Sequence, residues 1–203
     1  MCSHYFRRGR KFFGGFRVIG EVLRGVGFEF IVGGGVFSSK GVDEGTKLLV
    51  EYADVPEEGL LLDLGCGYGV IGIVFAKLYP KLKVYMVDVN PRAVELAKLN
   101  AKHNNVADRV VVLQGNLYEP VKGLRFNVIL SNPPLAAGMD TIEAIVRQAP
   151  EHLVEGGSLQ LVLRKGVERV KRVMEEVFGN CEVVVRKKGY TVLKSIAYAD
   201  HKR

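Results

Sequence analysis

Short apolar runs alternate with helical patterns along most of the chain, and this alternation predicts the fold. Residues 60–64 are apolar except for Asp63, which is typical of a parallel strand buried on both faces. A helical pattern over residues 70–78 follows at once. The same order recurs downstream, with strands expected at 83–89, 109–113, 126–130 and 158–163 and helices at 91–102, 139–153 and 167–178.

The C-terminal part of the chain departs from this strict alternation. Strands expected over 182–186 and 190–198 flank Lys188-Gly189, a pair suited to a tight hairpin turn. Glycines at 156–157 are expected to turn the chain into the strand at 158–163. The predicted fold class is therefore α/β, with a mostly parallel seven-stranded sheet and an antiparallel C-terminal hairpin.

The N-terminal part has a different pattern. We expect residues 1–58 to form a short β-rich extension and residues 59–203 to form the core, together making one compact domain. Within the extension, the expected elements are strands at 16–19 and 27–32 and a helix at 45–52 that Asp43 caps.

Three glycines at alternate positions, Gly65, Gly67 and Gly69, follow the strand that contains Asp63. Glycine lets a backbone turn tightly and approach a ligand that any Cβ would block. Dinucleotide enzymes seat a pyrophosphate at such a turn. An acid directly before the turn repels phosphate but suits a cationic ligand with an amine. S-adenosylmethionine, which has a sulfonium, an α-ammonium and no phosphate, is therefore the favoured cofactor.

A second acid, Asp88, follows the glycine turn at about the separation typical of a ribose-binding carboxylate. A carboxylate can accept hydrogen bonds from both hydroxyls of the adenosine ribose. The structural alternative is that Asp88 caps the next helix. Because Asn90-Pro91 already supplies a cap and a first-turn proline, we expect Asp88 to be free for the ribose.

The turn Asn132-Pro133-Pro134 follows another expected strand. The exocyclic amine of a base is a poor nucleophile because its lone pair is delocalised into the ring. The Asn132 side-chain oxygen and the Pro133 carbonyl can hold both amine hydrogens and direct the lone pair toward a methyl group, while the prolines bring no competing N–H. Such orientation requires no general base. An isolated turn of this kind is usually structural, but its place after Asp63 and Asp88 makes these three residues the candidate catalytic group.

These motifs resemble those of the class I S-adenosylmethionine-dependent methyltransferases that modify amino groups. Over residues 35–193, the chain is similar to the small-domain family that contains the 16S ribosomal RNA guanine-N2 methyltransferases. The resemblance implies a Rossmann-like fold and methyl transfer to guanine-N2 of ribosomal RNA. Bacterial members carry a duplicated domain, whereas this chain has one copy, as in an archaeal-type single-domain member. The similar motifs are Gly35-Val36-Phe37-Ser38, Val42-Asp43-x-Gly45-Thr46 and Asn132-Pro133-Pro134-x-x-x-Gly138.

The resemblance also implies roles for individual residues. Asn116, after the third core strand, is expected to face the adenine ring of the cofactor. An aromatic residue usually follows the two prolines and stacks on the target base; here Leu135 takes that position, and we expect Leu135 and Phe37 to cover the base. The implied cofactor-binding residues are Asp63, Gly65, Cys66, Gly67, Gly69, Asp88, Val89, Asn116, Asn132 and Thr46.

The charge of the chain favours a polyanionic partner. The net charge is +7, and residues 1–17 contain basic and aromatic side chains without an acid. Cations for phosphates beside rings for bases suit single-stranded RNA, so Arg7, Arg8 and Lys11 are candidate contacts to ribosomal RNA or the small ribosomal subunit. The alternative is that the rings join the core and the charges lie on a solvated face.

Three further functions remain open at this point. One is adenine-N6 methylation of nucleic acid. Another is methylation of a glutamine side-chain amide in a protein, which uses the same Asn-Pro-Pro chemistry, although release-factor modifiers carry a helical N-terminal domain and a Tyr after the prolines. The third is RNA binding without catalysis, which would not require Asp63, Asp88 and Asn132 together.

The remaining composition points to an ordinary globular protein. Hydrophobic residues make up 48% and charged residues 25%, no apolar run approaches a membrane span of about 20 residues, and no signal-peptide core is visible. The three cysteines are far apart in sequence, so no metal site is expected. We expect a cytoplasmic protein, and the sequence leaves its oligomeric state open between monomer and dimer.

Overall fold

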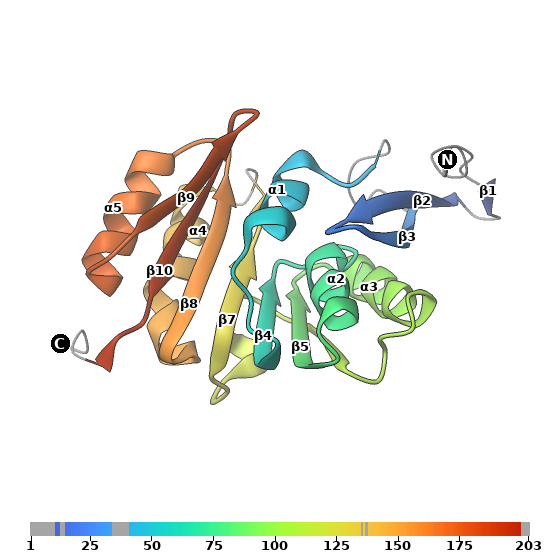
Figure 1. Cartoon of the computed structure of the whole chain (residues 1–203), viewed down its shortest axis with the longest axis horizontal. Coiled ribbons are helices and arrows are strands. Elements are labelled where there is room, and N and C mark those ends of the chain that lie inside the picture. Colours follow the sequence, from blue (N-terminus) through green and yellow to red (C-terminus); the bar gives the residue numbers. More distant parts are fainter. Residues whose placement is uncertain (1–10, 13–14, 34–40, 135, 137, 200–203) are drawn as a thin grey trace.

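The computed structural model describes residues 11–12, 15–33, 41–134, 136 and 138–199. A seven-stranded sheet forms the middle layer; α1, α2 and α3 cover one face, and α4 and α5 cover the other (Figure 1). The helices are α1 (Glu44–Tyr52), α2 (Val70–Leu78), α3 (Pro91–His103), α4 (Met139–Gln148) and α5 (Val167–Phe178). The strands of the sheet are β4 (Glu58–Leu64), β5 (Lys81–Asp88), β6 (Val110–Gln114), β7 (Phe126–Ser131), β8 (Leu153–Leu163), β9 (Glu182–Lys187) and β10 (Tyr190–Ile196).

The strand order is β6-β5-β4-β7-β8-β10-β9. The first five strands are parallel, and β10 is antiparallel to both β8 and β9. The predicted α/β fold with an antiparallel C-terminal hairpin is therefore confirmed. The chain reverses its direction of winding between β4 and β7, and ligands of open α/β sheets bind at such a point, beyond the carboxyl ends of the strands.

The segment between β7 and β8 differs from the sequence prediction. The helix expected over 139–153 ends at Gln148 and continues as a 3₁₀ turn, η3 (Ala149–His152), because Pro150 lacks the N–H that would extend the α-helix. The glycines at 156–157 lie inside β8 rather than in a turn before it, where its register with β7 shifts. A Cβ on Gly157 would lie 2.9 Å from the carbonyl oxygen of Phe126, so this glycine marks an irregularity where two backbones meet closely.

A second, smaller sheet consists of β1 (Lys11–Phe12), β2 (Phe16–Leu23) and β3 (Val26–Gly33). The strands β2 and β3 are longer than expected and are joined by Arg24-Gly25, whose φ angles are 47° and 76°. Such paired positive φ angles match the right-handed twist of a hairpin. A short 3₁₀ turn, η1 (Glu119–Val121), precedes β7.

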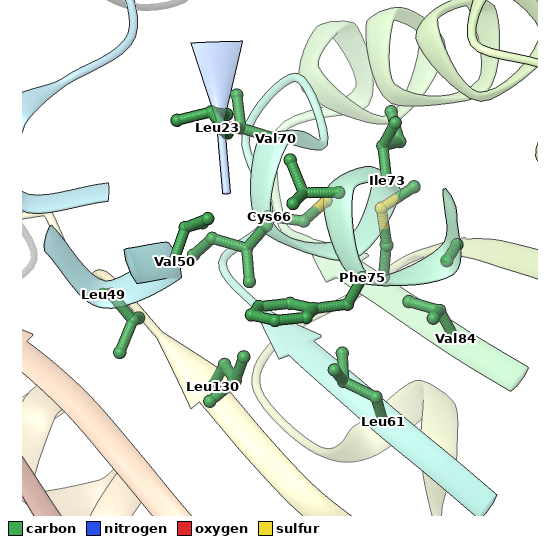
Figure 2. Close-up of a cluster of buried hydrophobic side chains, with 14 of the residues drawn as sticks. Leu23, Leu49, Val50, Leu61, Cys66, Val70, Ile73, Phe75, Val84 and Leu130 are labelled. Atoms are coloured by element: carbon green, nitrogen blue, oxygen red, sulfur yellow. The ribbon is translucent and has the colours of Figure 1, made fainter. Parts of the chain in front are cut away.

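Two apolar clusters hold the layers together, one on each face of the large sheet. The cluster on the face of α1, α2 and α3 also contains buried residues of the N-terminal hairpin. Figure 2 shows Leu23 of β2 next to Val70 of α2, with Val50 of α1 and Phe75 of α2 between Leu23 and the sheet. The hairpin and the large sheet therefore share one core.

A buried amide attaches this hairpin to α3. Asn100 is completely buried; its Oδ1 accepts from the N–H of Ile31 at 2.7 Å, and its Nδ2 donates to the carbonyl of Ile31 at 3.0 Å. The side chain thus pairs with the edge of β3 as a further strand would. Nδ2 also donates to the carbonyl of Tyr68 at 2.9 Å, which links the hairpin to the segment between β4 and α2.

Candidate functional site

The segment between β4 and α2 is a tight glycine turn. Gly65, Gly67 and Gly69 have φ angles of 74°, 56° and 96°, a region that only glycine adopts readily. The N–H groups of Gly65 and Cys66 donate to the carbonyl of Val87 on β5, at 2.8 and 3.0 Å. A Cβ on Gly65 would meet no atom within 4 Å, so the turn presents bare backbone to open space.

A pocket with an empty volume of about 460 Å³ opens beside this turn. Three separate segments contribute to it: the start of α1, the glycine turn with the start of α2, and the residue after β7. Its lining residues are Gly41, Asp43, Thr46, Gly65, Cys66, Gly67, Tyr68, Val70, Ile71 and Asn132.

Asp63 lies beneath the glycine turn and is completely buried. Its Oδ2 accepts from the N–H of Gly72 at 2.9 Å, while its Oδ1 has no partner in the described part of the chain. Burial raises the pKa of Asp63 to about 7; the nearby Asp88 adds to the rise, and the Gly72 hydrogen bond opposes it. An orphaned, buried carboxylate oxygen suits a site that receives a positive charge from a ligand.

Asp88 ends β5 and contacts the same turn. Its Oδ2 accepts from the N–H of Gly67 at 2.8 Å, and its Oδ1 accepts from the N–H of Asn90 at 2.9 Å. The expected cap by Asn90 is present, because its Oδ1 accepts from the N–H of Arg92 at 3.0 Å. Asp88 is therefore not free as expected, but a carboxylate has about four acceptor positions and can still receive a ribose hydroxyl.

Asn132 is held in a fixed orientation by two residues at the start of α1. Its Nδ2 donates to Asp43 Oδ2 at 2.7 Å and to Thr46 Oγ1 at 2.9 Å. Since a carboxylate only accepts, the amide nitrogen must face Asp43, and Oδ1 is directed the other way. The chain itself thus decides which end of this amide is available to a ligand.

Asp43 serves two further purposes. Its Oδ2 accepts from the N–H of Thr46 at 2.9 Å and so caps α1, and its Oδ1 accepts from the hydroxyl of Tyr190 at 3.4 Å. The Arg164 guanidinium lies 5.6 Å from the centre of the Tyr190 ring. A continuous series of contacts therefore leads from the end of β8 across β10 to Asn132.

The positioning contacts of Asp43 and Tyr190 are not predicted by the sequence. It predicts Asp43 as a helix cap and as part of a motif shared with the small-domain family, but 89 residues separate Asp43 from Asn132, so no local pattern connects the two. Its occurrence two residues before Gly45 in the motif shared with the small-domain family was the available signal. Gly45 packs against the Tyr190 ring, where a Cβ would come within 2.8 Å of a ring carbon.

The structure brings several of the expected site residues together. Thr46, Gly65, Cys66, Gly67 and Asn132 line one pocket. The others lie around it: Asp63 below the turn, Gly69 at the start of α2, Asp88 and the exposed Val89 at the end of β5, Asn116 exposed after β6, and Pro133 and Pro134 after Asn132, the first buried and the second exposed.

Four expected substrate contacts, Arg7, Arg8, Phe37 and Leu135, lie outside the described residues, and the fifth, Lys11, is in β1. Burial raises the pKa of the Cys66 thiol, and the neighbouring Asp63 and Asp88 add to the rise, so Cys66 is not a thiolate nucleophile.

Comparison with known proteins identifies the family. The sequence matches the family described as methyltransferase small domain over residues 27–194. The chain belongs to this family. This membership confirms the resemblance inferred from the motifs and agrees with the class I methyltransferase fold of the sheet.

Individual relatives cover most of the chain. It is 41% identical over 177 residues to YbxB, an uncharacterized protein of Bacillus subtilis, covering 85% of this chain and 88% of YbxB. It is 33% identical over 207 residues to ribosomal RNA small subunit methyltransferase C of Escherichia coli K12, covering 96% of this chain and 57% of that protein.

A solved structure shows the same arrangement. The Thermus thermophilus 16S rRNA N2 methyltransferase RsmC, in complex with AdoMet and guanosine, aligns with a TM-score of 0.81 and 26% identity, covering 91% of this chain and 51% of that chain. The chain therefore spans about half the length of the ribosomal RNA methyltransferases that it matches.

The described residues lack both a metal-binding cluster and a helix suited to a membrane. No group of three or more His, Cys, Asp or Glu side chains there could hold a metal ion. None of the helices in that part of the chain is both long and apolar enough to cross a membrane.

Proposed function

We propose that the protein transfers a methyl group from S-adenosylmethionine to the exocyclic amino group of a base in RNA, and that the base is guanine, modified at N2, in ribosomal RNA. The observation that carries this proposal is the fixed orientation of Asn132. With Nδ2 bound to Asp43 and Thr46, its Oδ1 is the end left to accept a hydrogen bond from an incoming amine.

The residues around the glycine turn fit S-adenosylmethionine. The bare backbone at Gly65 leaves room for a ligand, and Asp88 retains acceptor positions for ribose hydroxyls. Beneath the turn, Asp63 Oδ1 has no partner among the described residues and becomes a full anion when a cationic ligand favours its ionised form. We assign Asn116 to the adenine side, since it follows β6, next to the strand that carries Asp88. When bound, the cofactor supplies an electrophilic methyl group on its sulfonium.

The chain's contribution to the chemistry is orientation. Asn132 Oδ1 and the carbonyl of Pro133 accept the two amine hydrogens and direct the lone pair of the nitrogen toward the methyl group. Neither Pro133 nor Pro134 has an N–H that could compete for these acceptors. Holding the two reactants in this geometry lowers the barrier without a general base in the chain.

Guanine in ribosomal RNA is supported by the relatives. The T. thermophilus enzyme was solved with AdoMet and guanosine, and the E. coli relative is a ribosomal RNA small subunit methyltransferase. The net charge of +7 favours a polyanionic substrate. A soluble, cytoplasmic protein follows from a ribosomal RNA substrate.

The test is methyl transfer with labelled S-adenosylmethionine to undermodified ribosomal RNA, transfer RNA and a release factor, with the product mapped by mass spectrometry. We expect N2-methylguanine in ribosomal RNA. N6-methyladenine, or a methylated glutamine in the release factor, would instead identify one of the alternative functions.

The matched variant in this assay is Asn132→Ala. We expect its turnover to fall by about 100-fold or more, since it loses an oriented acceptor, while the Kd for the cofactor is unchanged. Unchanged turnover would contradict the role assigned to Asn132.

A further inference from the structure

At the carboxyl edge of the sheet, beside the pocket, the neighbouring strands β8, β10 and β9 carry a row of basic and aromatic side chains. Val162 on β8, Val192 on β10 and Val185 on β9 are aligned partners and lie in the same apolar cluster, beneath α1. Because side chains alternate along a strand, the residues two positions nearer the carboxyl edge lie on the same face. These residues are Arg164, Tyr190 and Lys187.

The contacts of this row agree with the alternation. Lys187 is the ladder partner of Tyr190, and the Arg164 guanidinium lies 5.6 Å from the centre of the Tyr190 ring. Arg164 and Lys187 are both exposed, as is Lys165, the next residue after Arg164. We call Arg164, Lys165, Lys187 and Tyr190 the basic rim.

The charge of the basic rim is not neutralised by the protein. In the described part of the chain, Arg164, Lys165 and Lys187 form no ion pair, whereas the neighbouring Arg186 and Lys188 are paired with Glu168 and Glu44 at 3.2 and 2.6 Å. Three exposed cations without an ion pair in that part of the chain, two of them next to Tyr190, are suited to the phosphates of a nucleic-acid strand.

The basic rim adjoins the proposed catalytic turn. The hydroxyl of Tyr190 donates to Asp43 at 3.4 Å, and Asp43 accepts from Asn132 at 2.7 Å. A strand whose base enters the pocket would therefore reach the rim with its next nucleotides. The N-terminal hairpin lies on the other side of α1 from β9 and β10 (Figure 1), so the rim and the β2–β3 hairpin are separate surfaces.

Lysines on an edge strand also have a structural explanation, because they discourage pairing with another sheet. That explanation covers Lys187, which is on the edge strand β9. It does not cover Arg164 and Lys165, which follow the interior strand β8. Both residues lie at the edge of the sheet that holds the pocket, and Arg164 also lies on the face of the pocket, so they require a different reason.

We propose that the basic rim binds the phosphodiester backbone of single-stranded RNA on the 5′ or 3′ side of the target base. This inference rests on the proposed function, because it takes RNA as the substrate. Lys165 and Lys187 supply charge to the phosphates, while Arg164, beside the Tyr190 ring, adds a third cation next to the residue that contacts Asp43.

The experiment compares two double variants that remove the same charge. Lys165→Gln/Lys187→Gln removes two cations from the rim; Lys81→Gln/Lys122→Gln removes two exposed lysines from the amino edge of the same sheet. Binding of a guanine-containing RNA oligonucleotide is measured without cofactor over a range of salt concentrations.

The slope of log affinity against log salt is negative, and for the rim variant it should become less steep by about 1.4, since each single-strand phosphate contact contributes roughly −0.7. If the two proteins converge near 1 M salt, this corresponds to roughly 25-fold weaker binding at 0.1 M salt. The amino-edge variant should bind like the wild type, and the cofactor Kd should be the same in all three proteins.

The outcomes separate this inference from the proposed function. If the wild type methylates RNA but the rim variant keeps the wild-type slope, the rim is not the RNA surface and the proposed function stands. Equal losses of RNA affinity in both double variants would show that the affinity depends on the net charge of the protein and not on the rim, and would overturn the inference. A wild type without salt-dependent RNA affinity overturns it as well, whatever substrate is methylated.

Discussion

The two hairpins beside α1 have turns of the same kind that use their basic residues differently. Arg24-Gly25 and Lys188-Gly189 both place a cation at positive φ, 47° and 52°, before a glycine. The Arg24 guanidinium donates to the carbonyls of Val50 and Ala53, at 2.7 and 2.5 Å, and lies 5.2 Å from the centre of the Phe75 ring. Lys188 contacts Glu44 at the surface, at 2.6 Å.

These different contacts of Arg24 and Lys188 lie at opposite ends of α1. At its C-terminal end, Arg24 satisfies carbonyls that the helix leaves unpaired, where a cation is also favoured by the helix dipole. At its N-terminal end, an exposed ion pair accompanies Asp43, which orients Asn132. The contacts of the first end are stabilising, whereas under the proposed function the second end chiefly positions Asn132.

The largest expected effect concerns Asp63, because it would show that a residue at the site can also change the stability of the fold. Its folded pKa of about 7 lies above its unfolded value, so the folded state retains a proton that the unfolded state loses as pH rises. Wild-type stability should therefore decline between about pH 4 and pH 7, by at most about 4 kcal/mol from this group.

The variant Asp63→Asn cannot ionise and should lack this component of the pH dependence. Chemical denaturation of both proteins from pH 4 to pH 8 measures it. Parallel stability curves would show that Asp63 does not titrate in this range.

The next effect should appear at the C-terminal end of α1. Arg24→Asn keeps a residue that tolerates the turn but removes the hydrogen bonds to Val50 and Ala53, which should lower the free energy of unfolding by about 3 kcal/mol. Measured below the unfolding transition, kcat should stay within about twofold of wild type, since Asn132 is not touched. A selective loss of kcat would contradict this difference between the two ends of α1.

A smaller effect is expected at the N-terminal end. Asp43→Ala removes the helix cap, at about 1 kcal/mol of stability, and leaves the amide of Asn132 able to flip. We expect kcat to fall by about 10- to 100-fold with an unchanged cofactor Kd. Glu44→Gln is the matched control, because it weakens the ion pair with Lys188 and leaves Asp43 in place; equal kcat losses in the two variants would argue against a positioning role.

The smallest effect should come from Lys188→Asn. Asparagine before glycine suits the turn better than lysine, and the lost surface ion pair is weak, so stability should change by less than about 1 kcal/mol in either direction. Thermal denaturation beside Arg24→Asn gives the comparison directly. A loss as large as that of Arg24→Asn would mean that both ends of α1 are structural.

Much of the fold could be predicted because its signals are local. The apolar run before Gly65 identifies the central strand, and each downstream helix follows a strand within a few residues. Two predictions were wrong because glycine and proline each occur in more than one kind of structure. Pro150 ends α4 earlier than expected, and Gly157 lies inside a strand instead of in a turn.

The candidate site was predictable only in part. The turn from Gly65 to Gly69 has its own sequence pattern, whereas the contact between Asp43 and Asn132 depends on how α1 packs over the sheet. Asp88 was expected to be free because the local sequence already provides a cap; its hydrogen bond with Gly67 crosses from β5 to the neighbouring turn, and no pattern within one segment shows it.

The side chain of Asn100 connects α3 to two parts of the molecule at once. Its buried amide bonds to Ile31 of the N-terminal hairpin and donates to the carbonyl of Tyr68 at the glycine turn. A displacement of α3 would therefore disturb the hairpin and the cofactor loop together, whereas a displacement of the hairpin alone leaves the bond to Tyr68 in place.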